Sequence, residues 1–596
     1  MRSKRPPGNA GAESREQVLS GLGAAPGIAI GPAHIVDSSI ATVPDYSIPA
    51  DAIEAETRRF AGAVDAAHRQ VAELEKRAAS GEGAGEDVAL LLAAHRKMLS
   101  DSRLLRGALR RIVEEQRNAE AAVRAEVDAL VAAFAALDDP YIAARGREVR
   151  DVGNRLLRQL LAAPVAALDD VPPGSVIVAD EITPADAALL DPQITAGFAS
   201  VAGGAEGHSA ILARALGLPA VLGVAGLLAA VRHGDIVIVD GDNGRVVVAP
   251  DAATLADYRR RLQARIAEQR GLARLRRLPA ITRDGETVAL HANIELPRET
   301  GRALSSGAEG IGLVRSEFLF MNRDDVPGED EQYAAYAAIV REMAGRPVTL
   351  RTLDIGGEKL AFPLADLHGE SANPALGLRA IRLSLRSPEL FDTQLAAMLR
   401  ASAHGPVRIL LPMVVTPAEV RQARERLTRV ARRLRRRRLA IADPLPPLGV
   451  MIEVPGAALG ADALAQVADF FAIGTNDLTM YTLAIDRGDE RVAYLYDPLH
   501  PAVLRLIQFS TQAALRARIP VSLCGEMAGD PAYAPLLLGL GIRELSMSPI
   551  GLPRVKRRVR ALDLGEATRR TEMIMMQADA SRVAALLADF NELVGD

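Results

Sequence analysis

From Ile281 onward, short apolar runs alternate with stretches long enough for a helix. Strands that alternate with helices favour a parallel sheet, because each helical crossover returns the chain to the same edge. Eight such runs begin near Val288, Gly310, Val348, Val407, Leu448, Phe470, Pro520 and Arg543. Eight strand–helix units in roughly 250–300 residues are typical of a TIM (β/α)8 barrel. We therefore expect residues 281–596 to form such a barrel.

Most of these predicted strands end in polar or charged residues. In a TIM barrel the C-terminal ends of the strands carry the catalytic groups. The residues at these ends are His291, Asn293, Arg315, Glu317, Arg351, Asp354, Glu453, Asn476, Asp477, Cys524 and Glu526. A single one of them could be a structural ion pair or a helix cap, but the whole set predicts an active site at this end.

Three arginines at or near these strand ends indicate an anionic substrate. Arg315 and Arg351 end neighbouring strands, and Arg487 lies just after a third. Converging guanidinium groups suit a small molecule with carboxylate and phosphate groups. Asn476 adds a neutral hydrogen-bond donor.

Two carboxylates and a thiol complete the predicted site. Glu453 and Asp477 end consecutive strands, and carboxylates placed in this way can hold Mg²⁺, which usually shares its ligand shell with substrate phosphate and water. Cys524 ends the next strand, and a thiol there could give a proton to a carbanion or enol carbon. The alternative for Cys524 is a small buried apolar residue, which is the commoner fate of a free cysteine.

A second candidate site lies at 203–214, where glycine and small residues lead into His208 and a short helical run follows. The pattern predicts a histidine on a flexible turn at a helix N-terminus, where free backbone N–H groups and the helix dipole favour an anion. A neutral imidazole there can attack phosphorus and hold the phosphoryl group covalently. The alternative is a histidine that only caps the helix.

The N-terminal half divides by pattern. Leu22 to Val36 indicates a strand pair, and β-rich runs return after Pro172-Pro173-Gly174. Between them lie amphipathic helical runs, a block that is either a structural insertion or a docking platform for a protein partner. The expected division is a disordered extension at 1–18, a discontinuous α/β domain at 19–45 and 162–250, the helical insertion at 46–161 and a linker helix at 251–280.

Composition argues against several classes of partner. The net charge of −4 gives no general reason to expect nucleic acid. The ten arginines of 421–438 alternate with apolar residues at helical spacing, so we expect an amphipathic barrel helix there. The longest uncharged apolar stretch, 215–231, is interrupted by glycine and proline and predicts no membrane span. The single cysteine excludes an internal disulfide and fits the cytoplasm.

Five sequence blocks together carry a resemblance to a known family. They are Gly310-Ile-Gly-Leu-Val-Arg-Ser-Glu-Phe-Leu-Phe-Met321, Arg351-Thr-Leu-Asp-Ile-Gly-Gly357, Asn373-Pro-Ala-Leu-Gly-Leu-Arg379, Asp469-Phe-Phe-Ala-Ile-Gly-Thr-Asn-Asp-Leu478 and Cys524-Gly-Glu-Met-Ala-Gly529. In these blocks the chain resembles the phosphoenolpyruvate–protein phosphotransferases, the enzyme I family of bacterial sugar phosphotransferase systems. The resemblance runs from about Gly21 to the C-terminal helices.

The resemblance implies a reaction and a set of roles. Phosphoenolpyruvate would phosphorylate His208, and the phosphoryl group would pass to an HPr-like carrier protein. The implied substrate-binding residues are Arg315, Arg351, Asn476, Asp477 and Arg487. Glu453 and Asp477 would bind Mg²⁺, and Cys524 would protonate the enolpyruvate carbon. The resemblance further implies a swivelling phosphohistidine domain, a homodimer through the barrel and a carrier-binding helical insertion, on which His95, Met98 and Leu99 are candidate contacts.

Two other functions fit parts of the sequence. A dikinase-type enzyme would share the histidine domain and the barrel, but the chain has no room for its ATP-binding domain. A catalytically impaired regulatory paralogue that only binds carriers is the main alternative. Family members usually carry a hydroxyl residue two positions before the histidine, and Glu206 stands there in this chain.

Overall fold

The computed structural model describes residues 16–36, 43–80, 85–100, 102–135, 140–161, 171–182, 186, 190–191, 194–203, 209–210, 213, 216–321, 325–355, 373–486, 489 and 491–594. The chain divides into two compact units, Met1–Ile266 and Ala267–Asp596, and each is described by itself.

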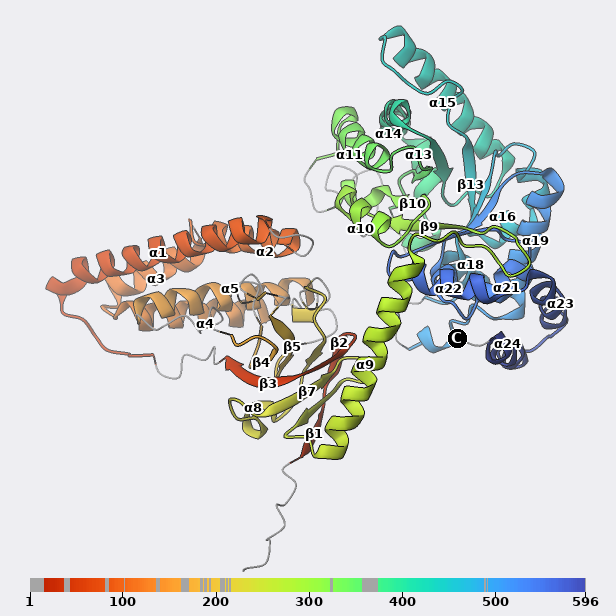
Figure 1. Cartoon of the computed structure of the whole chain (residues 1–596). Coiled ribbons are helices and arrows are strands. Elements are labelled where there is room, and N and C mark those ends of the chain that lie inside the picture. Colours follow the sequence, from red (N-terminus) through yellow and green to blue (C-terminus); the bar gives the residue numbers. More distant parts are fainter. Residues whose placement is uncertain are drawn as a thin grey trace, which may run out of the picture. The chain divides into compact units, whose positions relative to one another are not determined.

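The first unit combines a sheet with a block of helices (Figure 1). Its elements are β1 (Gln17–Ser20), β2 (Leu22–Ala25), β3 (Ile28–Val36), α1 (Ile53–Ser80), α2 (Gly85–Met98), α3 (Arg103–Glu114), α4 (Ala119–Ala135), α5 (Pro140–Leu160), β4 (Ser175–Ala179), β5 (Thr195–Ser200), β6 (Ala220–Leu222), α8 (Leu227–Ala230), β7 (Ile236–Asp240) and β8 (Arg245–Val248).

The described strands form one mixed sheet in the order β1-β8-β7-β3-β4-β5-β6-β2. β3 pairs in parallel with β4, from Ala33 opposite Val176 to Val36 opposite Ala179. The chain therefore leaves the sheet after β3, forms α1–α5, and returns beside the strand that it left. The predicted disordered extension at 1–18 is wrong at its end, because Gln17 and Val18 of β1 pair with Val248 and Val247 of β8. Short strands with little apolar character, such as this one, are specified by their pairing partner more than by their own sequence.

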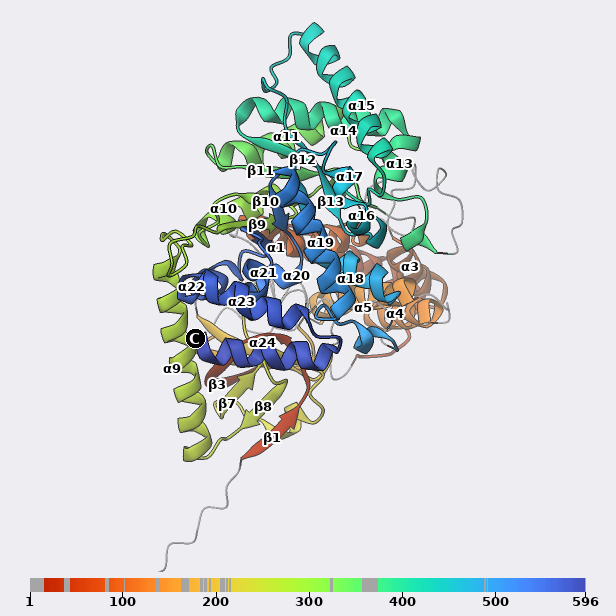
Figure 2. The same cartoon turned by 90° about the vertical axis from the view of Figure 1, so that its right-hand side faces the viewer.

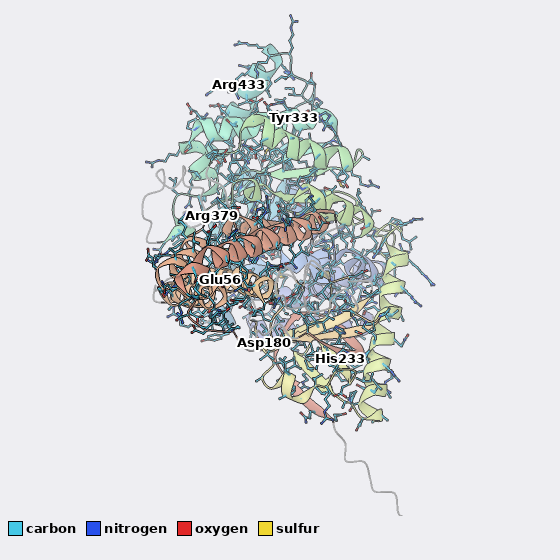
Figure 3. The ribbon with its side chains drawn as sticks, turned by 90° about the vertical axis from the view of Figure 1, so that its left-hand side faces the viewer. Glu56, Asp180, His233, Tyr333, Arg379 and Arg433 are labelled. Atoms are coloured by element: carbon cyan, nitrogen blue, oxygen red, sulfur yellow. The ribbon has the colours of Figure 1, made fainter. Side chains whose placement is uncertain are left out.

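The helices α1–α5 cover one face of this sheet (Figure 1). Alternate strand residues such as Ile177, Ala179 and Phe198 are buried in a core that continues into the helices. The predicted amphipathic character of the helical block is confirmed in α1, where Ala67 and Val71 are fully buried. Arg59 of α1 forms an ion pair at 2.6 Å with Glu120 of α4 and another at 2.6 Å with Glu56 of its own helix. Figure 3 labels Glu56.

The candidate carrier contacts at the end of α2 and directly after it are wrong for two of the three residues. His95 is 3% exposed and Leu99 is 2% exposed, so both side chains lie inside the helical block. Met98 is partly buried against the same core. A buried side chain cannot contact another protein. His95 and Leu99 therefore belong to the core of the helical block.

Helix α9 (Ala252–Leu275) leads into the second unit, which is a closed barrel of described strands surrounded by helices (Figures 1 and 2). The strands are β9 (Ala289–Ile294), β10 (Ile311–Arg315), β11 (Val348–Arg351), β12 (Val407–Leu411), β13 (Leu448–Ile452), β14 (Phe471–Ile473), β15 (Val521–Leu523) and β16 (Glu544–Met547). The helices are α10 (Thr300–Ser305), α11 (Glu329–Glu342), α13 (Ala380–Arg386), α14 (Pro388–Ala401), α15 (Pro417–Arg436), α16 (Pro455–Leu459), α17 (Ala461–Leu464), α18 (Thr475–Leu483), α19 (Pro501–Ala517), α20 (Glu526–Gly529), α21 (Ala534–Gly539), α22 (Leu552–Ala561), α23 (Leu564–Met575) and α24 (Ala580–Val594).

The predicted TIM barrel is confirmed, and all neighbouring strands pair in parallel around the ring. Its interior is packed by apolar side chains, among them Leu313, Leu410, Met451 and Phe470. The close approach of Phe470 requires a glycine at 449, because a Cβ there would lie 2.3 Å from the ring. The barrel is thus a filled scaffold, and its strand ends are held in fixed positions.

Helix α15 confirms the interpretation of the arginine run. Val420, Ala423, Leu427, Val430 and Leu434 are buried against the barrel, while many of the arginines lie on the outside. Figure 3 marks one of them, Arg433, near the C-terminal end of the helix. No described helix of the chain is both long and apolar enough to cross a membrane.

Candidate active site at the end of the barrel

Most of the predicted site residues come together at the C-terminal end of the barrel. Arg315 and Arg351 are the last residues of β10 and β11 and lie opposite each other in register. Glu453 directly follows β13, and Cys524 directly follows β15. Asn476 and Asp477 are shifted from the predicted end of a strand and lie in the first turn of α18. β14 is shorter than predicted because the helix begins at Thr475.

Arg351 is held between two carboxylates inside the barrel end. Its guanidinium group pairs with Glu317 and, at 3.2 Å, with Oδ2 of Asp354. Burial on its own lowers the pKa of Arg351, but Glu317 and Asp354 outweigh that effect and raise it. Arg351 is therefore a permanent, oriented cation.

A second, mostly buried cation is Arg379, to which the sequence pattern assigns no role. Its Nη2 and Nε lie 2.8 and 3.1 Å from Oδ1 of Asp354, and Nη2 lies 3.9 Å from Asp477. Its Nη1 donates to the Tyr481 hydroxyl at 3.3 Å. Arg379 stands at the start of α13, more than 20 residues after the end of β11, so strand-end reasoning could not locate it.

Together these groups form a barrel-end cluster, defined by the carboxylates of Glu317, Asp354, Glu453 and Asp477 and the guanidinium groups of Arg351 and Arg379. Four acids and two bases leave two negative charges when all are ionised. Glu453 shows the consequence most clearly, because it is 2% exposed. Burial raises its pKa well above the usual range, and Asp477 and Asp354 raise it further.

This excess negative charge fits a divalent cation. Glu453 and Asp477 offer hard oxygen ligands, and a bound cation would offset the charge that raises the pKa of Glu453. Within the described part of the chain, no three His, Cys, Asp or Glu side chains group as a complete metal site. Mg²⁺ suits such an incomplete set, because it usually completes its shell with water and substrate oxygens.

Cys524 lies beside this cluster in a buried position. It is 6% exposed and packs with Leu313 and Met451, so the apolar environment expected as its alternative is real. Its Sγ also faces the carbonyl of Ile473 at 3.7 Å and lines the cavity described next. Burial, followed by the charge of Glu453, raises the pKa of the thiol to about 12, although Arg351 and Arg315 oppose this. The thiol is therefore protonated at neutral pH.

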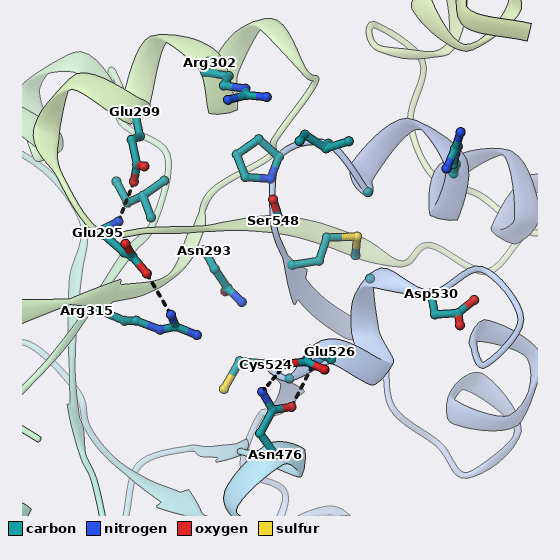
Figure 4. Close-up of a pocket in the computed structure, with 18 of the residues that line it drawn as sticks. Asn293, Glu295, Glu299, Arg302, Arg315, Asn476, Cys524, Glu526, Asp530 and Ser548 are labelled. Carbon is teal, nitrogen blue, oxygen red and sulfur yellow. Dashed lines mark hydrogen bonds and ion pairs between the residues drawn. The ribbon is translucent and has the colours of Figure 1, made fainter. Parts of the chain in front are cut away.

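A cavity of about 710 Å³ opens over Cys524 at this end of the barrel (Figure 4). Arg315 and Asn476 both line it. Asn476 donates to Oε1 of Glu526 at 3.1 Å and accepts from the Glu526 backbone N–H at 3.0 Å, which fixes its orientation. Arg315 pairs at 2.8 Å with Glu295, a residue that the sequence analysis did not identify. The cavity thus combines a cation, an oriented amide and a protonated thiol.

Two predicted site residues, His208 and Arg487, lie outside the described residues, as do Glu206 and Gly207. The described neighbours of His208 are consistent with a helix start. Gly203 has a φ of +132°, and Ser209 and Ala210 are helical and buried. The Ser209 hydroxyl donates to the carbonyl of Ile182 at 3.0 Å, which anchors this segment to the loop after β4.

Comparison with known proteins agrees with this geometry. Models of PEP-utilising enzymes match three segments, the PEP-binding domain at 269–564, the N-terminal domain at 20–145 and the mobile domain at 171–244. The phosphoenolpyruvate-protein phosphotransferase of Cupriavidus necator is 43% identical over 551 residues, which cover 91% of this chain and 94% of that protein. The proteins of the same name from Bacillus sp. and Geobacillus stearothermophilus are each 42% identical and cover 96% of this chain and 98% of their own length.

Proposed function

We propose the following roles for the residues of this chain, which belongs to the family of phosphoenolpyruvate–protein phosphotransferases. As such it is an enzyme that transfers the phosphoryl group of phosphoenolpyruvate to protein and releases pyruvate. The observation that carries the assignment of roles is that Arg315, Asn476 and the protonated Cys524 line one cavity. Glu453 and Arg351 of the barrel-end cluster lie close enough to Cys524 for their charges to act on its pKa.

The arginines bind the substrate. Arg315 and Arg351, joined by Arg487, receive its phosphate and carboxylate groups, with Asn476 and Asp477 completing the site. Arg379 belongs to the same set, since it is mostly buried, cationic and close to Asp477. Fixed guanidinium groups also stabilise the negative charge that moves during phosphoryl transfer.

Glu453 and Asp477 hold Mg²⁺. The cation supplies Lewis-acid stabilisation of the phosphate and enolate oxygens when it is bound. Glu453 is kept in place by the Met413 backbone N–H, which donates to its Oε1 at 2.6 Å. This contact fixes one carboxylate oxygen and leaves the other for the ion.

The chemistry requires a nucleophile and an acid. A nitrogen of His208 forms a bond to phosphorus while the bond from phosphorus to the enol oxygen breaks, and the enolate of pyruvate remains. The Cys524 thiol then gives its proton to the methylene carbon, and the thiolate recovers a proton from solvent. A thiol with a pKa of about 12 is fully available as an acid at neutral pH.

The phosphohistidine passes its phosphoryl group to an HPr-like carrier, which docks on the helices α1–α5. This transfer takes place in the cytoplasm and belongs to the first step of a phosphotransferase system. Because one histidine must meet both the barrel and the carrier, the α/β domain swivels between them. The enzyme is a homodimer through its barrel.

The variant Glu453→Gln tests the division of labour. Loss of one metal-binding charge should reduce phosphoenolpyruvate-dependent phosphorylation by at least about a hundredfold. Exchange of phosphate between His208 and a phosphorylated carrier should stay within about twofold, because that half-reaction uses no barrel residue. Both rates can be followed with radiolabelled phosphate. Glu425→Gln, an exposed change on α15, is the control.

An equal loss of both half-reactions in Glu453→Gln would contradict the proposed roles. Unchanged rates of both half-reactions in Glu453→Gln would show that Glu453 is not a metal ligand. A wild-type protein that binds the carrier but forms no pyruvate would favour the regulatory paralogue.

A further inference from the structure

We infer that Glu295 is a built-in competitor for Arg315 that weakens the binding of the anionic substrate. The inference rests on the proposed function, in which Arg315 binds phosphoenolpyruvate. It concerns an acidic residue at the point where a substrate anion must arrive.

The contact follows from the strand order. β9 and β10 are parallel neighbours, and Ile294 lies opposite Val314. Glu295 directly follows β9 and Arg315 ends β10, so their side chains leave the sheet side by side. Oε1 of Glu295 accepts a hydrogen bond from Nη1 of Arg315 at 2.8 Å, and both residues line the cavity (Figure 4).

The loop that carries Glu295 is held independently of this ion pair. The carboxylate of Glu299 accepts from the backbone N–H of Glu295 at 2.6 Å and from that of Leu296 at 3.2 Å. The backbone at Glu295 is therefore fixed by Glu299, and the ion pair with Arg315 involves only the Glu295 side chain. A change at the Glu295 carboxylate should leave this loop in place.

Neither charge of this ion pair needs the other as a partner, because neither side chain is buried. The side chain of Arg315 is 43% exposed and that of Glu295 is 33% exposed. Exposed ion pairs contribute little to stability, because both charges are well solvated without each other. Glu295 therefore differs from Glu317, which pairs with a buried arginine inside the barrel.

Glu295 carries a cost for an anionic ligand. A phosphate or carboxylate that binds Arg315 must either displace the Glu295 carboxylate or lie next to its negative charge. The charges of the cavity wall as a whole do not compensate. Its charged residues are Glu295, Glu299, Glu526 and Asp530 against Arg302, Arg315 and Arg554. Glu295 is thus expected to raise the Kd and the KM for phosphoenolpyruvate.

The test is the isosteric variant Glu295→Gln in the full-length chain. Phosphoenolpyruvate with Mg²⁺ is titrated by calorimetry into a His208→Ala protein, which cannot consume it, with and without Glu295→Gln. We expect Kd to fall by about three- to tenfold, since one charge contact at a partly exposed site is removed. In the protein with His208 intact, KM should fall by a similar factor while kcat stays within about twofold.

Asp530→Asn is the matched control, because it removes the same charge from the same cavity at a residue that does not contact Arg315. Tightening by less than threefold in Glu295→Gln, weaker binding, or equal tightening in Asp530→Asn would each overturn the inference. Phosphoenolpyruvate that fails to bind the His208→Ala protein, together with a wild type that makes no pyruvate, would instead overturn the proposed function, and the inference with it.

Discussion

His208→Ala is expected to accept no phosphate from phosphoenolpyruvate, a loss to background level. The imidazole is the only atom group that this change removes, and a methyl side chain cannot form a bond to phosphorus. Acid-labile, base-stable protein phosphate measured after incubation with labelled phosphoenolpyruvate and Mg²⁺ is the direct readout. The variant should remain folded, because the next turn is anchored by Ser209 and the buried Ala210.

His233→Ala is the control for that experiment. His233 lies exposed on the turn before β7 of the same unit, and its loss is the same chemical change. This variant should be phosphorylated as the wild type is. Acid-labile phosphate on His208→Ala at the wild-type level would show that another residue is the nucleophile.

Cys524→Ala is expected to lose steady-state turnover by about a hundredfold or more, the usual range for removal of a positioned acid. Binding of phosphoenolpyruvate and Mg²⁺ should be retained, because no arginine or metal-binding carboxylate is changed. Pyruvate made in deuterated water should lose its stereospecific labelling at the methyl carbon, since solvent then protonates the enolate from either face.

The raised pKa of Cys524 adds a pH test. A group with a pKa of about 12 stays in its neutral, proton-donating form at every pH below that value. Ionisation of Cys524 should therefore cause no fall in wild-type turnover between pH 7 and 9. Any fall measured in this range should persist in Cys524→Ala. Wild-type turnover and stereochemistry in Cys524→Ala would mean that the cysteine only packs against Leu313 and Met451.

The barrel was predictable from sequence because its strands are apolar runs separated by helices. Each strand begins within one residue of its predicted start. The residues that directly end strands, Arg315, Arg351, Glu453 and Cys524, follow from the same pattern, because parallel strands bring their C-terminal ends together.

What the sequence could not supply depends on side-chain pairing across distant segments. Arg379 reaches Asp354 and Asp477 from a helix start, and no periodicity marks it. Glu295 gains its meaning only from its distance to Arg315. The burial that raises the pKa of Cys524 depends on residues from several strands. His95 and Leu99 show the opposite case, because both are buried although their segment offers them as candidate surface residues.

A single-turnover experiment tests the central claim most directly. The wild-type protein is mixed with limiting phosphoenolpyruvate, labelled on phosphorus, and Mg²⁺, then quenched and analysed for pyruvate, protein-bound phosphate and free phosphate. We predict equal amounts of pyruvate and acid-labile phosphoprotein, with the label passing to an HPr-like carrier when it is added. Pyruvate accompanied by free inorganic phosphate and no phosphoprotein, or no pyruvate at all, would contradict the account.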